Sequence, residues 1–202
     1  FGQCREVVIG YAPVLAIRVT YIGELGYELY MPPEYAAHLY ESLWEAGRDL
    51  GIRDAGYRAI DSLRLEKGYC YWGAEVSPDY SPFDAGIGFA VHLDKGPFIG
   101  RDALLKIKQG GPRLRLCIFT LDHDRPILLS GGETITHRGK VVGAVSSGGY
   151  GHTVGKTIAL GYLPASDADH QDGFAIEVFG EAIPATRLMK APYDPERSRI
   201  FL

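Results

Sequence analysis

The chain of 202 residues carries 21 Lys and Arg against 25 Asp and Glu, a formal net charge of -4, and 46% of its residues are hydrophobic. This composition supplies enough apolar side chains for a packed core, and the lack of excess basic residues argues against nucleic-acid binding. No apolar run approaches the roughly 20 residues of a transmembrane helix, so no membrane partner is expected. The 3 cysteines are far apart and form no CxxC pair, which argues against a disulfide framework or a structural zinc site and favours a reducing compartment.

The first half of the chain mixes extended and helical patterns, which predicts an α+β domain over residues 1–109. Gly51 and Gly68 are placed as the C-terminal stops of two helices. The expected elements are strands at residues 14–20, 27–31 and 89–93, and helices at residues 32–50, 58–67 and 101–109.

The second half changes to short β runs separated by turn residues, after a linker predicted at residues 110–112. Strands of this kind with no long helix between them predict a small all-β barrel over residues 113–202. Two-residue joins at Arg138-Gly139 and Gly180-Glu181 suit tight hairpins. The expected strands are residues 114–121, 133–137, 140–146, 157–163, 174–179 and 182–188.

Residues 151–157, GHTVGKT, resemble a phosphate-binding P-loop only superficially. A P-loop needs four residues between its glycines, and here Gly151 and Gly155 are separated by three. The segment also precedes a predicted strand, so no helix N-terminus follows to receive an anion. A structural hairpin is the better interpretation. The pair Gly86 and Gly88 likewise lacks the third glycine and the helix of a dinucleotide site, so no FAD site is expected within the chain.

Five other segments are dense in glycine, aromatic and charged residues at fixed spacing. They are residues 21–30, YIGELGYELY; 63–73, LRLEKGYCYWG; 82–91, PFDAGIGFAV; 98–104, FIGRDAL; and 148–156, GGYGHTVGK. In this order they resemble the tetrahydrofolate-binding half of the sarcosine and dimethylglycine dehydrogenases, a branch of the glycine-cleavage T-protein superfamily. The resemblance implies an N-terminally truncated folate-binding domain followed by the C-terminal barrel of that superfamily.

Glu28 is the foremost candidate for binding the cofactor. A pterin ring presents two parallel N–H donors, and one carboxylate can accept both in a forked arrangement. The resemblance gives this role to the last Glu of the segment 21–30, which is Glu28, and places Tyr21 at the same site. Gly23 and Gly26 are expected to turn the backbone so that these two residues converge. Tyr193 is expected to close the folate cavity from the C-terminal tail.

The segment 61–68, DSLRLEKG, is interpreted as scaffold, in which Arg64 and Glu66 are expected to be ion-paired groups at the surface or at a domain interface. T-proteins carry a folate-contacting arginine just before this segment, where this chain has Ile60, and the difference favours the flavoenzyme branch. Trp72 and its neighbouring tyrosines are expected to fill a domain junction rather than stack on a ligand.

The resemblance implies an enzyme in which an upstream FAD domain oxidises an N-methyl amine and the iminium product passes its carbon to tetrahydrofolate. FAD and the acid–base aspartate are expected upstream of Phe1, so the chain alone is expected to bind folate weakly and to catalyse nothing. A glycine-cleavage aminomethyltransferase and a non-catalytic regulatory relative stay open as alternatives. A bacterial cytoplasm or a mitochondrial matrix is the expected compartment, and homo-oligomer formation stays open.

Overall fold

The computed structural model describes residues 1–202, which form two compact units. One unit comprises residues 1–61 with 196–202, and the other comprises residues 62–195. This division differs from the boundary predicted near residues 110–112, because the chain from Ser62 onward makes its contacts with the barrel: Leu65, for example, packs on Ile158 and Leu160. The domain limits 1–109 and 113–202 stay a prediction.

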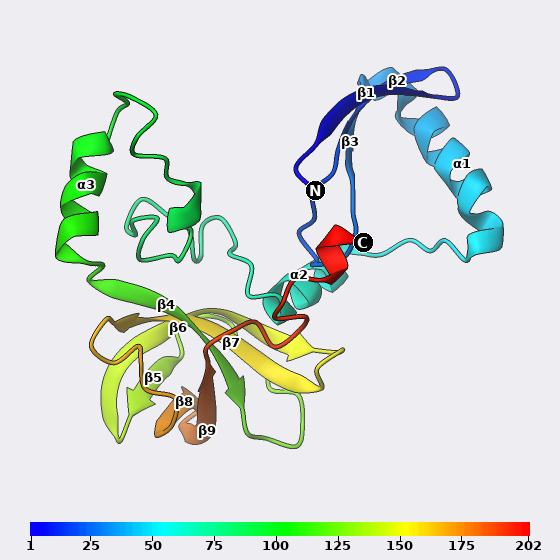
Figure 1. Ribbon diagram of the computed structural model, residues 1–202. Helices are drawn as coiled ribbons and strands as arrows, with labels where there is room; N and C mark the ends of the chain where they lie inside the picture. The colour runs from blue at the N-terminus through cyan, green and yellow to red at the C-terminus, as the bar shows by residue number, and fades with distance from the viewer. The chain divides into compact units, whose positions relative to one another are not determined.

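The first unit is a three-stranded antiparallel sheet with one helix beside it (Figure 1). Strands β1 (Cys4–Ile9), β2 (Ala12–Ile17) and β3 (Glu28–Tyr30) lie in that order. Strand β1 is not predicted by the sequence, because CREVVI lies at an edge and shows no period-2 alternation. Apolar side chains of one sheet face, among them Ala12 and Val14, pack with Leu39 of the helix.

The helix predicted over residues 32–50 consists of three consecutive pieces. Its central part is α1 (Ala36–Gly47), preceded by the 3-10 turn η1 (Pro33–Tyr35) and followed by η2 (Arg48–Leu50). Gly51 ends it with a φ of 76°, the left-handed conformation that glycine adopts without steric cost. The expected C-terminal stop is therefore confirmed.

The second unit begins within α2 (Tyr57–Glu66) and also contains α3 (Arg101–Gly110). The strand predicted over residues 89–93 is wrong. The chain there forms the 3-10 turn η3 (Gly88–Ala90), in which the amide of Val91 donates to the carbonyl of Gly88 at 3.0 Å. The apolar run FAV suggested a buried strand. In the structure Phe89 is 82% exposed, so the run does not contribute to a core there.

Six antiparallel strands close into a barrel in the order β4-β7-β6-β5-β8-β9 (Figure 1). The predicted barrel, with no helix of three turns between its first and last strands, is confirmed. Its core is filled by fully buried side chains such as Phe119, Ile135, Leu163 and Ile176. The strands are β4 (Leu114–Leu121), β5 (Thr134–His137), β6 (Lys140–Gly151), β7 (Lys156–Pro164), β8 (Phe174–Val178) and β9 (Glu181–Leu188).

Strand β6 is longer than predicted and carries a β-bulge. Its register against β7 shifts between Val145 and Ser147, so that Ser146 is an extra residue in the ladder. Close to the bulge the two strands approach tightly, since a Cβ added to Gly161 would lie 2.7 Å from the carbonyl oxygen of Ala144. None of the helices combines the length and apolarity that crossing a membrane requires.

Candidate functional site

Glu28 stands at the start of β3, opposite Ile17 of β2. Its side chain is exposed, and its Oε2 accepts a hydrogen bond of 2.5 Å from the hydroxyl of Tyr30. Residues two apart on a strand share a face, so this bond runs along one side of the sheet. The hydrogen bond to the carboxylate raises the pKa of the Tyr30 phenol. Tyr30 thereby orients the carboxylate and leaves Oε1 and one lone pair of Oε2 for further donors.

The sheet face that carries Glu28 is opposite to the face that packs on α1. Strand pairing places Leu15 level with Tyr30, and Pro13 level with Val8. These side chains are exposed, 72% for Val8 and 52% for Tyr30. They line an open groove of about 540 Å³ that runs to Pro32. Glu6 lines the groove as well, and Glu28 adjoins it through its hydrogen bond with Tyr30. Apolar side chains with carboxylates at the edge have the composition of a site for a planar polar ring.

Tyr21 lies in the loop between β2 and β3, and its side chain is half-buried. The hydroxyl of Thr20 accepts hydrogen bonds of 3.2 Å from the amides of Ile22 and Gly23, which closes the first turn of this loop. Gly23 has a φ of 79°, and a Cβ on Gly26 would lie 3.0 Å from the carbonyl oxygen of Val19. The glycines therefore make the turn and the close approach that a larger residue would prevent. The convergence of Tyr21 and Glu28 on one site stays a prediction.

Tyr193 belongs to the second unit, whereas Glu28 and Tyr21 belong to the first. Its amide donates to the carbonyl of Glu66 at 3.0 Å, and the Lys67 ammonium lies 5.8 Å from the centre of its ring. Lys67 also forms an ion pair of 3.1 Å with Asp194, and the Lys67 side chain is only 1% exposed. These contacts fix the segment 193–194 against the end of α2, and the role of Tyr193 toward folate stays a prediction.

The segment 61–68 is scaffold, but its charged residues are buried rather than at the surface. Glu66 is 1% exposed, and its Oε1 accepts hydrogen bonds from the amides of Thr153 and Val154 at 2.6 and 3.2 Å. These amides lie in the turn that resembles a P-loop, between β6 and β7. The Glu66 carboxylate therefore takes the hydrogen bonds that a bound phosphate would need from these amides. The segment forms the turn between β6 and β7, which supports its interpretation as a structural hairpin.

Glu75 is the residue of this region that the sequence analysis misses. It is fully buried, and its Oε2 lies 3.3 Å from Arg64 and accepts the amide of Tyr71 at 2.8 Å. Its Oε1 accepts hydrogen bonds from the hydroxyls of Ser146 and Ser147 at 2.5 and 2.6 Å. The sequence shows a lone glutamate among turn residues, and no local pattern indicates that two of its partners, Ser146 and Ser147, lie more than 70 residues away along the chain.

The two halves of the chain match two family models. The GCVT N-terminal domain matches residues 1–95, and the glycine cleavage T-protein C-terminal barrel domain matches residues 115–194. The chain is 40% identical over 200 residues to 4-methylaminobutanoate oxidase (formaldehyde-forming) of Paenarthrobacter nicotinovorans, over 98% of this chain and 24% of that protein. It is 41% identical over 195 residues to mitochondrial sarcosine dehydrogenase of Mus musculus, over 93% of this chain and 21% of that protein.

A third relative is described as a regulatory subunit. The mitochondrial pyruvate dehydrogenase phosphatase regulatory subunit of Mus musculus is 42% identical over 165 residues, 79% of this chain and 19% of that protein. Among solved structures, the glycine cleavage system aminomethyltransferase T of Bartonella henselae superposes with a TM-score of 0.80 and 30% identity, over 91% of this chain and 50% of that one. The chain thus spans about a quarter of the oxidase and half of the aminomethyltransferase. Both of its parts, in sequence and in fold, identify it as a member of the glycine-cleavage T-protein family.

Proposed function

We propose that the chain is the tetrahydrofolate-binding, one-carbon-transfer part of an FAD-dependent dehydrogenase or oxidase of N-methyl amines. The observation that carries the proposal is the exposed Glu28 carboxylate, oriented by Tyr30 on the sheet face opposite α1. The family relationship supports the class of ligand, and the relatives named for sarcosine and 4-methylaminobutanoate support the class of amine.

The residues around Glu28 fit a reduced pterin. The carboxylate accepts the ring N–H and the exocyclic amine in a forked arrangement, which fixes both the position and the in-plane orientation of the ring. The aliphatic side chains of Val8, Pro13 and Leu15 offer apolar contact to a ring face, and the groove of about 540 Å³ is large enough for it. Tyr30 keeps its hydrogen bond to Oε2 throughout, because each carboxylate oxygen has two lone pairs.

Tetrahydrofolate, when bound, supplies the amine nitrogens that take up the one-carbon unit from an iminium. Glu28 contributes by holding the ring still while the iminium arrives, so that transfer proceeds within one complex. The FAD that generates the iminium, and the acid–base group, are assigned to parts of the enzyme other than this chain. The chain holds the acceptor and performs no oxidation alone. Because it has both bacterial and mitochondrial relatives, we propose that the protein works in a bacterial cytoplasm or in a mitochondrial matrix.

Two alternatives have specific support. The superposition with aminomethyltransferase T favours an aminomethyltransferase without a flavin, although Ile60 stands where the family resemblance implies a folate-contacting arginine. The likeness to a phosphatase regulatory subunit favours a fold kept for assembly. The three functions differ in what they do with an N-methyl amine, because only the first consumes it.

The test uses the flavin-containing enzyme that carries this chain, with sarcosine, dimethylglycine and 4-methylaminobutanoate as substrates. We expect amine-dependent flavin reduction and, with tetrahydrofolate present, methylene-tetrahydrofolate in place of free formaldehyde. Methylene-tetrahydrofolate formed only from an aminomethylated lipoyl carrier would establish the aminomethyltransferase instead. Absence of folate binding and of any turnover would establish the regulatory alternative.

A further inference from the structure

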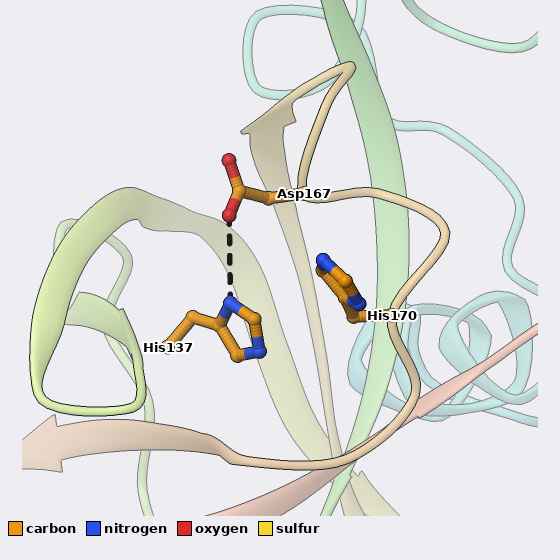
Figure 2. A group of neighbouring side chains, drawn as sticks. All are labelled: His137, Asp167 and His170. Carbon is orange, nitrogen blue, oxygen red and sulfur yellow. Dashed lines mark ion pairs between the residues drawn. The ribbon is translucent and has the colours of Figure 1, made fainter.

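Two histidines and an aspartate gather beside the barrel, in residues to which no role has been given so far. His137 is the last residue of β5, and Asp167 and His170 lie in the loop between β7 and β8. Figure 2 shows the Asp167 carboxylate pointing at one ring nitrogen of His137, with the His170 ring next to it. One donor atom from each residue lies within 4.8 Å of the others.

The loop is folded so that its two ligand-type side chains share one side. The amides of Asp167 and Ala168 both donate to the carbonyl of Pro164, at 2.9 and 3.2 Å, and the amide of His170 donates to the carbonyl of Asp167 at 3.2 Å. Consecutive tight turns of this kind bring residues three apart onto the same side. The loop is tied to the end of β5 as well, because the amide of Arg138 donates to the carbonyl of Gly173 at 2.8 Å. The three side chains therefore meet through backbone hydrogen bonds rather than by chance.

The separation of His137 and Asp167 is unusual for a hydrogen bond and suitable for two metal ligands. Nδ1 of His137 and Oδ1 of Asp167 are 3.4 Å apart, longer than the 2.7–3.2 Å that is usual for N–H···O bonds. Two ligands at about 2.0–2.2 Å from a tetrahedral Zn²⁺ lie roughly 3.3 Å from each other. This pair is thus already at the distance that a shared ion requires.

His137 also has a buried nitrogen that the protein leaves without a partner. The residue is 8% exposed, and its Nε2 makes no hydrogen bond. The ring is held in place by stacking on Phe174, with centroids 4.6 Å apart. A buried polar nitrogen is normally paired, so this ring is incompletely satisfied. Its other nitrogen, Nδ1, faces Asp167 and is the one placed to bind an ion together with that carboxylate.

His170 completes the group from the solvent side. Its ring stacks on that of His137 at a centroid distance of 4.7 Å and an angle of 29°, and its side chain is exposed. To reach a common ion it must move by up to about 1.5 Å, the difference between the 4.8 Å limit and the separation of two zinc ligands. An exposed side chain on a loop can make that movement by changing rotamer.

We propose that His137, Asp167 and His170 bind a divalent transition-metal ion, with a water molecule as fourth ligand. Two imidazoles and one carboxylate are the ligands that Zn²⁺ takes in four-coordinate sites, and they do not suit Mg²⁺ or Ca²⁺, which prefer oxygen. The ion would link the end of β5 to the loop between β7 and β8. The inference does not depend on folate binding by the first unit.

The experiment is titration of the metal-free, tag-free chain with Zn²⁺ by calorimetry, and with Co²⁺ by visible absorption. We expect one ion per chain and the absorption bands of four-coordinate Co²⁺ with nitrogen and oxygen ligands. His170→Ala and Asp167→Asn should each weaken the affinity at least about tenfold. Both positions are at least partly exposed, so the variants should keep the far-UV circular dichroism of the parent chain.

His123→Ala is the matched control, because His123 is an exposed histidine of the same unit that hydrogen-bonds the backbone of Arg125, two residues along the chain. Its affinity for both ions should equal that of the parent chain. Equal affinity of the parent chain and His170→Ala, or no saturable binding by the parent chain, would overturn the proposal. Either result would leave the three residues as a stacked ring pair with one ion pair.

Discussion

Arg64 of α2 and Glu75 face each other at 3.3 Å with side chains only 3% and 0% exposed. Both partners make further hydrogen bonds. Arg64 donates to the carbonyl of Tyr69 and to the hydroxyl of Ser147, at 3.2 and 3.0 Å. An ion pair in such surroundings loses the solvation of two charges, and the added hydrogen bonds compensate for that loss. It joins α2 to the bulged strand of the barrel and so explains why the second unit includes residues well before the predicted linker.

Glu75→Gln is expected to destabilise the second unit by about 3–5 kcal/mol, because it leaves the Arg64 charge buried without its counter-charge. The free energy of unfolding should be measured by urea denaturation followed by circular dichroism. Glu177→Gln is the control, since Glu177 is an exposed residue of β8, and it should change stability by less than about 0.5 kcal/mol. Similar losses in both variants would contradict a special role for Glu75.

Glu28→Gln in the proposed flavin-containing enzyme is expected to weaken tetrahydrofolate binding by about 1.5–3 kcal/mol, the range for hydrogen bonds to a charged group. Reduction of the flavin by the amine should keep its rate, because Glu28 has no part in that step. Calorimetry gives the affinity, and stopped-flow absorbance gives the flavin reduction rate. Glu34→Gln, at another exposed carboxylate of the first unit, should leave both unchanged. Flavin reduction slowed in parallel with folate affinity would contradict the assignment of Glu28.

Asp84 should make the stability of the second unit depend on pH. Burial acts to raise the pKa of this carboxyl, but hydrogen bonds from the Ser81 hydroxyl and from the amides of Leu114 and Ser81 outweigh it and lower the pKa. A group whose pKa is lower in the folded than in the unfolded chain stabilises the fold above the unfolded value, near 3.9. That contribution disappears as the pH falls through the lowered pKa.

Asp84→Asn is therefore expected to cost roughly 1–2 kcal/mol at pH 7. The difference from the parent chain should shrink as the pH falls below about 4. Urea titrations between pH 3 and pH 7 would measure it, with Asp172→Asn, at an exposed residue, as the control. A difference that stays constant over this range would show that hydrogen-bond geometry, and not ionisation, is what Asp84 contributes.

The three cysteines should react with a thiol reagent at very different rates. Burial, followed by the charge of Glu75, raises the pKa of Cys70 to about 11, and burial raises the pKa of Cys117. At pH 8 only about one Cys70 in a thousand would be a thiolate. Cys4 is exposed, so alkylation followed by peptide mass spectrometry should find it modified first. Early modification of Cys70 would mean that the Glu75 network opens in solution.

The barrel could be predicted from the sequence because its strands are short β runs separated by turn residues and its hairpins use residues with special backbone conformations. Arg138 and Gly139 both have positive φ, as a tight hairpin requires. The 3-10 turn at Phe89 could not be told from a strand, since three apolar residues fit either and only contacts in the folded chain decide. Glu28 could be proposed as a candidate ligand only through the family resemblance, because nothing in the local sequence distinguishes it from other exposed glutamates.

The Glu75 site could not be predicted for a related reason. In a regular strand, neighbouring side chains point to opposite faces. The sequence pattern therefore predicts that Ser146 and Ser147 lie on opposite sides of β6. The bulge removes that alternation, and both hydroxyls reach the same carboxylate oxygen. Register irregularities depend on long-range pairing and leave no periodic trace in the sequence.

The bulge has a consequence for how this chain can change in length. Ser146 adds nothing to the ladder, so its deletion would regularise the strand pairing and would look harmless in an alignment of strand lengths. Deletion would nevertheless leave a single hydroxyl for Glu75 Oε1. Val145 and Ser147 would keep their partners Gly161 and Leu160, and with them their faces of the barrel. The residue that pairs with nothing across the strand thus serves the buried carboxylate and not the strand pairing, and a chain one residue shorter here is expected to keep the barrel register and to lose one hydrogen bond to Glu75.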